Sequence, residues 1–425
     1  MSLTQTFLNF VKVNKNEMNS KSINFVQNLF CKYYTEEYIP NINSSIGKRE
    51  FGFILFKEGM LRHKKFKDKS ELKAFLRNFV PSDVYCSCAY YEDPEAEMEK
   101  KGWFGADLIF DIDADHIVTS CSKVHDEWIC GNCGFSGKGI EPEKCPVCGG
   151  EKFEVNTWPC ENCLASAKAE TVKLLDMLMR DFGFSEKELH VFFSGHRGYH
   201  VHVESEAVKS LDAVARKEIV DYVCGLGFDA TLHGLSGGGS HAFENLNLNS
   251  SGWRGRVARG IYDFILTANP EDYKSLGMRG NVVKAIMKNK EAILKMLNGA
   301  DAYGNFKGVG FETLKKIAEF CAKSKAAQVD TVVTTDTHRL IRLANTLHGK
   351  TGLKKVEFPI SKIEDFDPFE SAVAFKKGTA TVLVSSAPKF KLGGEIFGPY
   401  KNQKVELPMA AAMLLVCKGR AEVVE

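Results

Sequence analysis

Two aspartates at the end of an apolar segment are the residues best placed to do chemistry. Asp111 and Asp113 close the segment 108–113, whose other members are Leu, Ile and Phe. Side chains at positions i and i+2 of a strand point to the same face, so a strand here places both carboxylates together. Two adjacent carboxylates are hard to keep ionised without a cation between them. The pair therefore predicts a divalent metal site with oxygen ligands.

A second chemical motif lies downstream, in the segment 194–202. It reads Ser194-Gly195-His196-Arg197-Gly198-Tyr199-His200 and continues to His202. Hydroxyl, imidazole and guanidinium donors flanked by glycine are typical of an anion site, and phosphate is the anion that an arginine fork suits best. A metal site and a phosphate site together indicate nucleotide chemistry.

Between these motifs lie seven of the thirteen cysteines. Two CxxC pairs are separated by eleven residues, and each pair is followed by glycine. This spacing predicts a zinc ribbon with four thiolate ligands, against the alternative of four reduced structural cysteines. The ribbon ligands are Cys130, Cys133, Cys145 and Cys148.

Further candidate ligands flank the ribbon. Cys160 and Cys163 form a third CxxC pair, and Cys121 and His125 precede the ribbon. The simplest nested assignment gives these four residues to a second zinc, with the ribbon inserted between its halves. A lone histidine is usually an ordinary surface or packed residue, so His125 is the weakest member. Four protein ligands leave no open position, which predicts one or two structural zinc sites.

Local patterns predict the elements that position these residues. Strands are expected at 51–56, 84–91, 108–113, 190–193, 199–203 and 329–334, with helices at 70–79, 164–182 and 207–224. The segment 257–325 is helical and Lys-rich without strand signals. We predict a mixed α/β core from 1–256 plus 326–425, a zinc-binding insertion at 121–163, and a separate helical insertion at 257–325.

Composition bounds the class of protein. The chain has 425 residues, 44% hydrophobic and 26% charged, with a net charge of +2, which is ordinary for a globular protein and too small for a polycation. The sequence has no run of 18 or more apolar residues, so no membrane-spanning helix is expected. No signal peptide is expected either. A cytoplasmic location is therefore expected.

Taken in order, these motifs resemble those of the small catalytic subunit of archaeal and eukaryotic DNA primase. The similarity runs over nearly the whole length. Its carriers are Phe110-Asp111-Ile112-Asp113, the cysteine knuckle, Ser194 to His200, Val329-Asp330-Thr331, His338 to Arg342, Leu347 to Gly352, and Arg62 with Arg49-Glu50-Phe51 upstream. Two features depart from the family pattern, namely the inserted second ribbon and His196.

The resemblance implies a fold, an activity and residue roles. The fold would be a primase catalytic core of mixed α/β type with a zinc knuckle and a variable helical insertion. Asp111, Asp113 and Asp330 would hold two Mg²⁺ or Mn²⁺ ions for nucleotidyl transfer. A further set would bind the incoming triphosphate: Arg62, Ser194, His196, Arg197, His200, Arg342 and His348.

The same resemblance implies a place at the nucleoid, or in the nucleus if the chain is eukaryotic, and it also implies partners. These are a single-stranded DNA template, NTPs or dNTPs, and a large subunit with an iron–sulfur domain, for which this chain has no spare four-cysteine set. Two other interpretations stay open: a primase-like repair polymerase that extends gaps, and a non-catalytic zinc-ribbon scaffold that binds nucleic acid. The intact acid pair argues against the scaffold.

Overall fold

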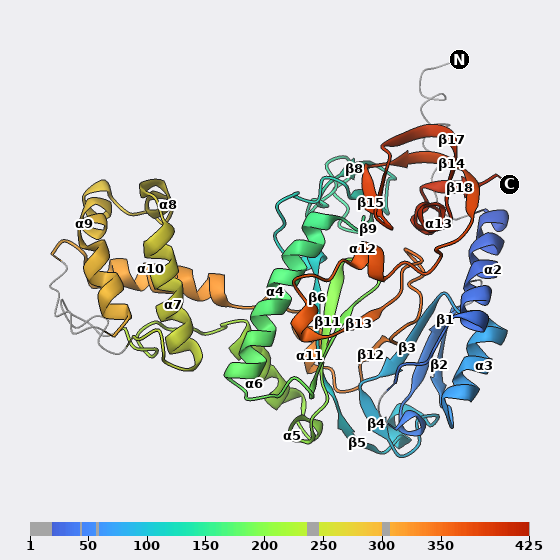
Figure 1. The fold of residues 1–425 in the computed structure, drawn as a ribbon, viewed down its shortest axis with the longest axis horizontal. Coiled ribbons are helices and arrows are strands. Elements are labelled where there is room, and N and C mark those ends of the chain that lie inside the picture. Colours follow the sequence, from blue (N-terminus) through green and yellow to red (C-terminus); the bar gives the residue numbers. More distant parts are fainter. Residues whose placement is uncertain (1–18, 43–44, 57–58, 236–245, 300–306, 425) are drawn as a thin grey trace. The chain divides into compact units, whose positions relative to one another are not determined.

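The structure is a computed structural model that describes residues 19–42, 45–56, 59–235, 246–299 and 307–424. Helices and several sheets alternate along the chain, so the predicted mixed α/β class is confirmed (Figure 1). The chain divides into two compact units, the first of residues 1–169, 187–213 and 330–425 and the second of residues 170–186 and 214–329. The predicted helical insertion at 257–325 falls inside the second unit.

The first unit contains two four-stranded sheets that matter for the site. The first sheet has the order β12-β3-β1-β2 and the second β13-β10-β11-β6, with antiparallel neighbours throughout. Their strands are β1 (Phe51–Ile54), β2 (Met60–Lys64), β3 (Asp83–Ser87), β6 (Leu108–Asp113), β10 (Leu189–Phe193), β11 (Gly198–Val203), β12 (Leu340–Arg342) and β13 (Val356–Phe358).

Burial explains the apolar sequence of β6, which is an edge strand of its sheet. Leu108, Ile109, Phe110 and Ile112 are at most 3% exposed, whereas the two aspartates are only partly buried. A strand covered on both faces is expected to be almost continuously apolar. The polar residues therefore appear only where the strand ends.

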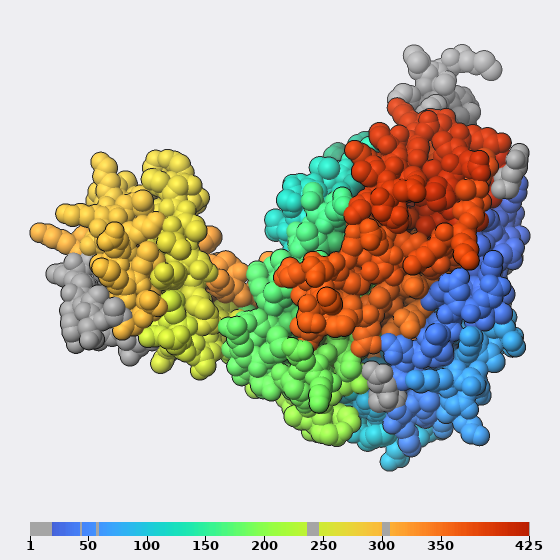
Figure 2. Space-filling view, viewed as in Figure 1, coloured from blue at the N-terminus to red at the C-terminus, as the bar shows by residue number. Residues whose placement is uncertain are grey.

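Smaller elements complete the first unit. They are α2 (Ser20–Glu36), α3 (Lys69–Phe79), α5 (Glu206–Lys209), α11 (Thr331–Thr335), α12 (Pro368–Ser371), α13 (Met409–Cys417), the pair β4 (Ala89–Tyr91) and β5 (Trp103–Ala106), the sheet β8-β7-β9 (Ser136–Lys138, Glu127–Cys130, Phe153–Asn156), the pair β15 (Phe390–Leu392) and β16 (Glu395–Phe397), and the sheet β17-β14-β18 (Tyr400–Pro408, Thr379–Ala387, Ala421–Val423). The C-terminal segment, orange to red in Figure 2, covers much of the first unit on the face shown.

The second unit is helical in its described residues. Helices α7 (Gly252–Thr267), α8 (Pro270–Ser275), α9 (Gly280–Leu297) and α10 (Phe311–Lys325) pack on one another (Figure 1). The unit also contains most of α6 (Ala213–Val223) and the C-terminal part of α4 (Glu161–Arg180). Part of the Gly- and Ser-rich segment 230–256 lies outside the described residues, and its last residues belong to α7.

One predicted element is wrong. The segment 329–334 contains Val and Thr and was expected to be a strand, but the structure has the short helix α11 at Thr331–Thr335. Asp330 is its N-cap, and its carboxylate accepts hydrogen bonds from the backbone N–H groups of Val332 and Val333 at 2.9 and 3.3 Å. The carboxylate of an aspartate at the N-cap accepts hydrogen bonds from backbone N–H groups at the start of a helix, which have no partner within the helix. The cap overrides the weak strand preference.

None of the helices in the described part of the chain combines the length and the apolar composition needed to span a bilayer.

Candidate active site with two metal-ligand clusters

Three aspartates meet at the end of β6. Asp111 and Asp113 lie on this strand, and the backbone N–H of Asp330 donates to the carbonyl of Asp111 at 2.8 Å. Residues far apart in the sequence thus supply acids to one place. The three residues predicted to bind the catalytic metals are therefore neighbours through this backbone contact, although they are not among the groups of described residues whose ligand atoms all lie within 4.8 Å of one another.

Electrostatics at these aspartates favour a cation. Burial, followed by the neighbouring carboxylates of Asp113 and Asp330, raises the pKa of Asp111 to about 7. Burial, together with the carboxylate of Asp115, also raises the pKa of Asp113 to about 6. Crowded carboxylates resist ionisation unless positive charge compensates them. An oxygen-only set of this kind fits Mg²⁺ or Mn²⁺.

The segment 194–200 forms a tight loop and then β11, beside the acids. Gly198 faces Asp113 and His200 faces Asp111 in the register of β11 with β6. A Cβ at Gly198 would lie 2.4 Å from the carbonyl oxygen of Ile112, so this close approach requires glycine. Gly198 therefore allows β11, which follows the phosphate-motif loop, to pair with β6, which carries Asp111 and Asp113.

Several motif side chains are buried and hydrogen-bonded. The hydroxyl of Ser194 accepts from the backbone N–H groups of His196 and Gly198 at 3.3 and 3.2 Å, which closes the loop. Nε2 of His200 lies 3.6 Å from the Asp111 carboxylate. The rings of His196 and His348 lie 5.2 Å apart between centroids. The loop and the C-terminal motif thus come together.

Burial keeps the three candidate histidines neutral. It lowers the pKa of His196, His200 and His348 well below the ordinary value, and nearby cations strengthen the effect. Among these cations, Lys418 lowers the pKa of His196 most, and Lys355 lowers the pKa of His200 most. A neutral imidazole still donates one hydrogen bond.

The candidate arginines are already paired. Arg342 donates to the carboxylate of Asp83 at 2.6 Å, and Arg62 donates to Glu50 at 3.0 Å. Arg197 is 1% exposed and pairs with two carboxylates, those of Asp126 and Asp115. Among the described residues, Arg62 forms its ion pair with Glu50 rather than with any of the three aspartates. The structure thus does not bring it into direct contact with them.

The cysteine-rich insertion contains two groups of four ligand atoms, each group within 4.8 Å. The groups are Cys121, His125, Cys160 and Cys163, and Cys130, Cys133, Cys145 and Cys148. These are the nested sets that the spacing predicts. Both groups have the composition that zinc prefers.

The spacing of the sulfur atoms fits a tetrahedral ion. The Cys130–Cys148 and Cys133–Cys145 Sγ pairs are each 3.6 Å apart. Ligands at about 2.3 Å around a tetrahedral zinc lie about 3.7 Å from one another. Backbone N–H groups, that of Cys133 first, lower the pKa of the Cys130 thiol to about 7, which favours the thiolate. The residues present therefore fit zinc.

Comparison with known proteins identifies the family. A family model described as DNA primase small subunit matches residues 156–360. The protein named DNA primase small subunit PriS from Nitrosopumilus maritimus is 31% identical over 96% of this chain and 100% of its own length. Those from Cenarchaeum symbiosum and Methanothrix thermoacetophila are 34% and 33% identical, over 95% and 96% of this chain and 99% and 100% of their own lengths.

The chain belongs to the DNA primase small-subunit family. The resemblance inferred from the motifs is thereby confirmed.

Sequence reasoning missed several charged residues of this primase family member. Asp115 and Asp126 hold Arg197, and Asp83 holds Arg342 while accepting from the N–H of Gly349 at 3.1 Å. Asp115 continues the i, i+2 series of the metal aspartates, and Asp126 directly follows a predicted zinc ligand, so both carried a signal. Asp83 lies in a different strand and carried none.

Two buried lysines were also missed. Burial lowers the pKa of Lys355 to about 7, and Arg342 contributes to the shift. The pKa of Lys418 is likewise lowered to about 7, mainly by burial and by Lys350. Nζ of Lys418 lies 3.1 Å from Nε2 of His196. These lysines place two amines, whose charged form burial disfavours, behind the phosphate motif of the primase subunit.

Proposed function

We propose that this chain is the catalytic subunit of a DNA-dependent primase, which makes short RNA or DNA primers on single-stranded DNA during replication. Family membership supports primer synthesis. The observation that carries the proposal is the meeting of Asp111, Asp113 and Asp330 beside the phosphate motif. A binding scaffold has no use for such a cluster.

The three aspartates would hold two Mg²⁺ or Mn²⁺ ions. When bound, these ions activate the primer 3′-hydroxyl and stabilise the leaving pyrophosphate. Strand β6 fixes Asp111 and Asp113, and the N-cap position fixes Asp330, so the ligands are pre-organised before substrate arrives. Nε2 of His200 lies 3.6 Å from the carboxylate of Asp111.

The triphosphate site would form from the motif residues on the basic side of the aspartates. His196, His200 and His348 donate as neutral imidazoles, which is consistent with the lowered pKa values. Arg342 would reach phosphate by exchanging Asp83 for it, and Arg197 by exchanging the more exposed Asp115 while it keeps its contact with Asp126. The planar guanidinium can pair with either anion.

The roles of Arg62 and Ser194 differ. Arg62 lies half-exposed on β2, where Glu50 holds it, and is proposed to contact the outer phosphates. Ser194 would contribute by shaping the loop, because its hydroxyl already accepts two backbone hydrogen bonds.

Both cysteine clusters would hold structural zinc, and the chain would work with a large subunit. The name of the relatives, a small subunit, supports a large partner subunit. An iron–sulfur domain on that partner is part of the proposal. Template binding would be shared with that partner.

The decisive experiment is synthesis on an unprimed single-stranded template with NTPs, in Mg²⁺ or Mn²⁺, with the wild type and with Asp111→Ala and Asp113→Ala. The exposed Asp365→Ala is the matched control. We expect short new chains from the wild type and the control only. Appreciable synthesis by either variant of the acid pair would contradict the assignment.

Extension of a supplied primer without any initiation would favour the repair polymerase. The assay is therefore repeated with purified large subunit, because initiation that needs the partner would otherwise look the same.

A further inference from the structure

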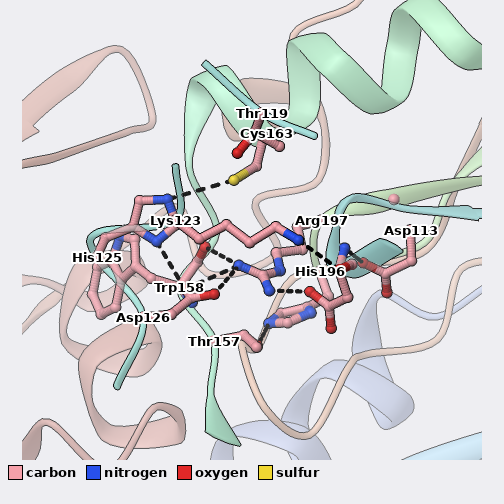
Figure 3. Close-up of polar contacts among 12 residues, drawn as sticks. Asp113, Thr119, Lys123, His125, Asp126, Thr157, Trp158, Cys163, His196 and Arg197 are labelled. Carbon is pink, nitrogen blue, oxygen red and sulfur yellow. Dashed lines mark hydrogen bonds and ion pairs between the residues drawn. The ribbon is translucent and has the colours of Figure 1, made fainter. Parts of the chain in front are cut away.

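His125 faces two different groups with its two ring nitrogens. Nε2 lies 3.4 Å from the Sγ atoms of Cys121 and Cys163, inside the predicted zinc cluster. Nδ1 lies 2.8 Å from the carboxylate of Asp126 (Figure 3). A metal on Nε2 leaves the proton on Nδ1, which then donates to Asp126. This arrangement of metal, histidine and carboxylate is common around metal sites.

Asp126 is a buried junction, with a side chain that is 3% exposed. It accepts from the backbone N–H of Trp158 at 2.8 Å, in addition to His125. Nη1 of Arg197 donates to both of its oxygens, at 3.0 and 2.8 Å. The carboxylate cannot rotate without losing several of these bonds, so its position is fixed from three sides.

Arg197 connects Asp126 to the turn that follows β6. Its Nη2 pairs with the carboxylate of Asp115, two residues after Asp113. The backbone N–H of Asp115 in turn donates to the carboxylate of Asp113 at 2.9 Å. A second link runs in parallel, because Nζ of Lys123 donates to the carbonyl of Asp115 at 2.5 Å. Lys123 lies between two predicted zinc ligands.

We propose that Asp126 is a positioning residue that couples occupancy of the Cys121–His125–Cys160–Cys163 cluster to the geometry of the catalytic turn 113–115. Zinc in this cluster fixes His125, which fixes Asp126, Arg197 and the turn. Loss of the metal frees His125 and loosens the turn that carries Asp113. The proposal rests on the proposed function only where nucleotide binding is concerned.

The second cluster provides the contrast. None of its ligands Cys130, Cys133, Cys145 and Cys148 appears among the contacts of Asp126 or Arg197 in the described residues. Coupling to the catalytic turn is therefore specific to the His-containing cluster.

The first test is independent of activity. Amide hydrogen exchange is followed at residues 113–117 in the zinc-loaded full chain, with the wild type, Asp126→Asn and His125→Cys. The cysteine variant keeps four zinc ligands but removes the contact to Asp126. We expect exchange at 113–117 to rise about tenfold in both variants and in chelator-treated wild type.

Zinc content is measured on the same samples, by release to a colorimetric chelator. Asp126→Asn should weaken zinc in one cluster by about 10- to 100-fold, whereas His125→Cys should retain both ions. Cys148→Ser, which disables the other cluster, is the control and should leave exchange at 113–117 unchanged.

Equilibrium binding of NTP completes the design. We expect its Kd to rise about tenfold in Asp126→Asn and His125→Cys. Unchanged exchange at 113–117 in both variants, or the same loosening in Cys148→Ser, would overturn the coupling. If the wild type itself failed to bind NTP, the proposed function would fail while the exchange and zinc results still decided the coupling.

Discussion

At the scale of single residues, the site is built from charges that are unfavourable alone. Asp111 is partly buried beside two other carboxylates, and its pKa is raised to about 7. Asp111 therefore binds a proton more tightly in the folded metal-free protein than in the unfolded chain, where the pKa of an aspartate is about 3.9. The stability that this proton contributes is fully present below the pKa of the unfolded chain and is lost as the pH rises through 7. The site favours the metal at a cost to the apo fold.

This argument predicts that Asp111→Asn stabilises the metal-free protein. At pH 8 we expect a gain of roughly 1–2 kcal/mol, less than the pKa shift alone implies because the carboxylate is partly solvated. Urea unfolding in chelator at pH 8 and at pH 5 measures it. The gain should shrink at pH 5, where the wild-type carboxyl is protonated. Asp365→Asn, at an exposed position, should change neither value.

Arg342 tests the anion side of the site. Arg342→Lys keeps the charge but loses the planar fork that pairs with carboxylate or phosphate. We expect the KM for NTP to rise about tenfold with a smaller change in kcat. Steady-state synthesis at varied NTP concentration distinguishes the two parameters. A loss confined to kcat would remove Arg342 from ground-state nucleotide binding.

At the scale of elements, α11 shows one residue with two roles. Asp330 caps the helix through its carboxylate and lies beside Asp111. An asparagine keeps the cap but loses the charge, whereas an alanine loses both. We expect Asp330→Asn to keep the wild-type stability and lose synthesis, and Asp330→Ala to lose about 1 kcal/mol as well. Active Asp330→Asn protein would leave the residue as a cap only.

Strand pairing makes a separate prediction at Gly198. Its Cβ would clash with the backbone of β6 at Ile112, so Gly198→Ala should push the two strands apart at the end that carries Asp113. We expect a lower melting temperature and loss of synthesis. Gly280→Ala, at a helix position with open space, is the control and should be neutral or slightly stabilising.

Local signals predicted most of the elements that hold the site. Strand β6 followed from its apolar run, and the two CxxC sets followed from spacing. The helix at Asp330 could not be predicted, because its β-branched residues favour a strand and the cap gives the opposite signal. Asp83 and Lys418 could not be found either, since only the fold brings them to Arg342 and His196. Long-range ion pairs leave no local trace in the sequence.

At the scale of the whole molecule, metal-ligand sets tie distant segments of the first unit together. The His-containing cluster joins residues 121–125 to 160–163, and the small sheet β8-β7-β9 lies between them in the sequence. Closing such a loop with a metal removes entropy from the unfolded chain, and binding free energy becomes folding free energy. Zinc is thus expected to hold the insertion against the core.

Removing zinc should therefore lower stability. We expect a strong chelator to lower the melting temperature of the wild type by several degrees, with recovery when Zn²⁺ is restored. Differential scanning calorimetry at fixed protein concentration measures it. An unchanged melting curve with both ions removed would mean that the clusters do not stabilise the fold.

The central claim is that Asp111, Asp113 and Asp330 form one divalent-metal centre that acts with the nucleotide. Its most direct test is Mn²⁺ binding, followed by the paramagnetic signal of free Mn²⁺ with and without a non-hydrolysable NTP analogue, in the zinc-loaded wild type and in Asp111→Asn. The account predicts about two Mn²⁺ per wild-type chain when the analogue is present and a loss of at least tenfold in affinity in the variant, at unchanged zinc content. Equal Mn²⁺ affinity and stoichiometry in the two proteins would contradict it.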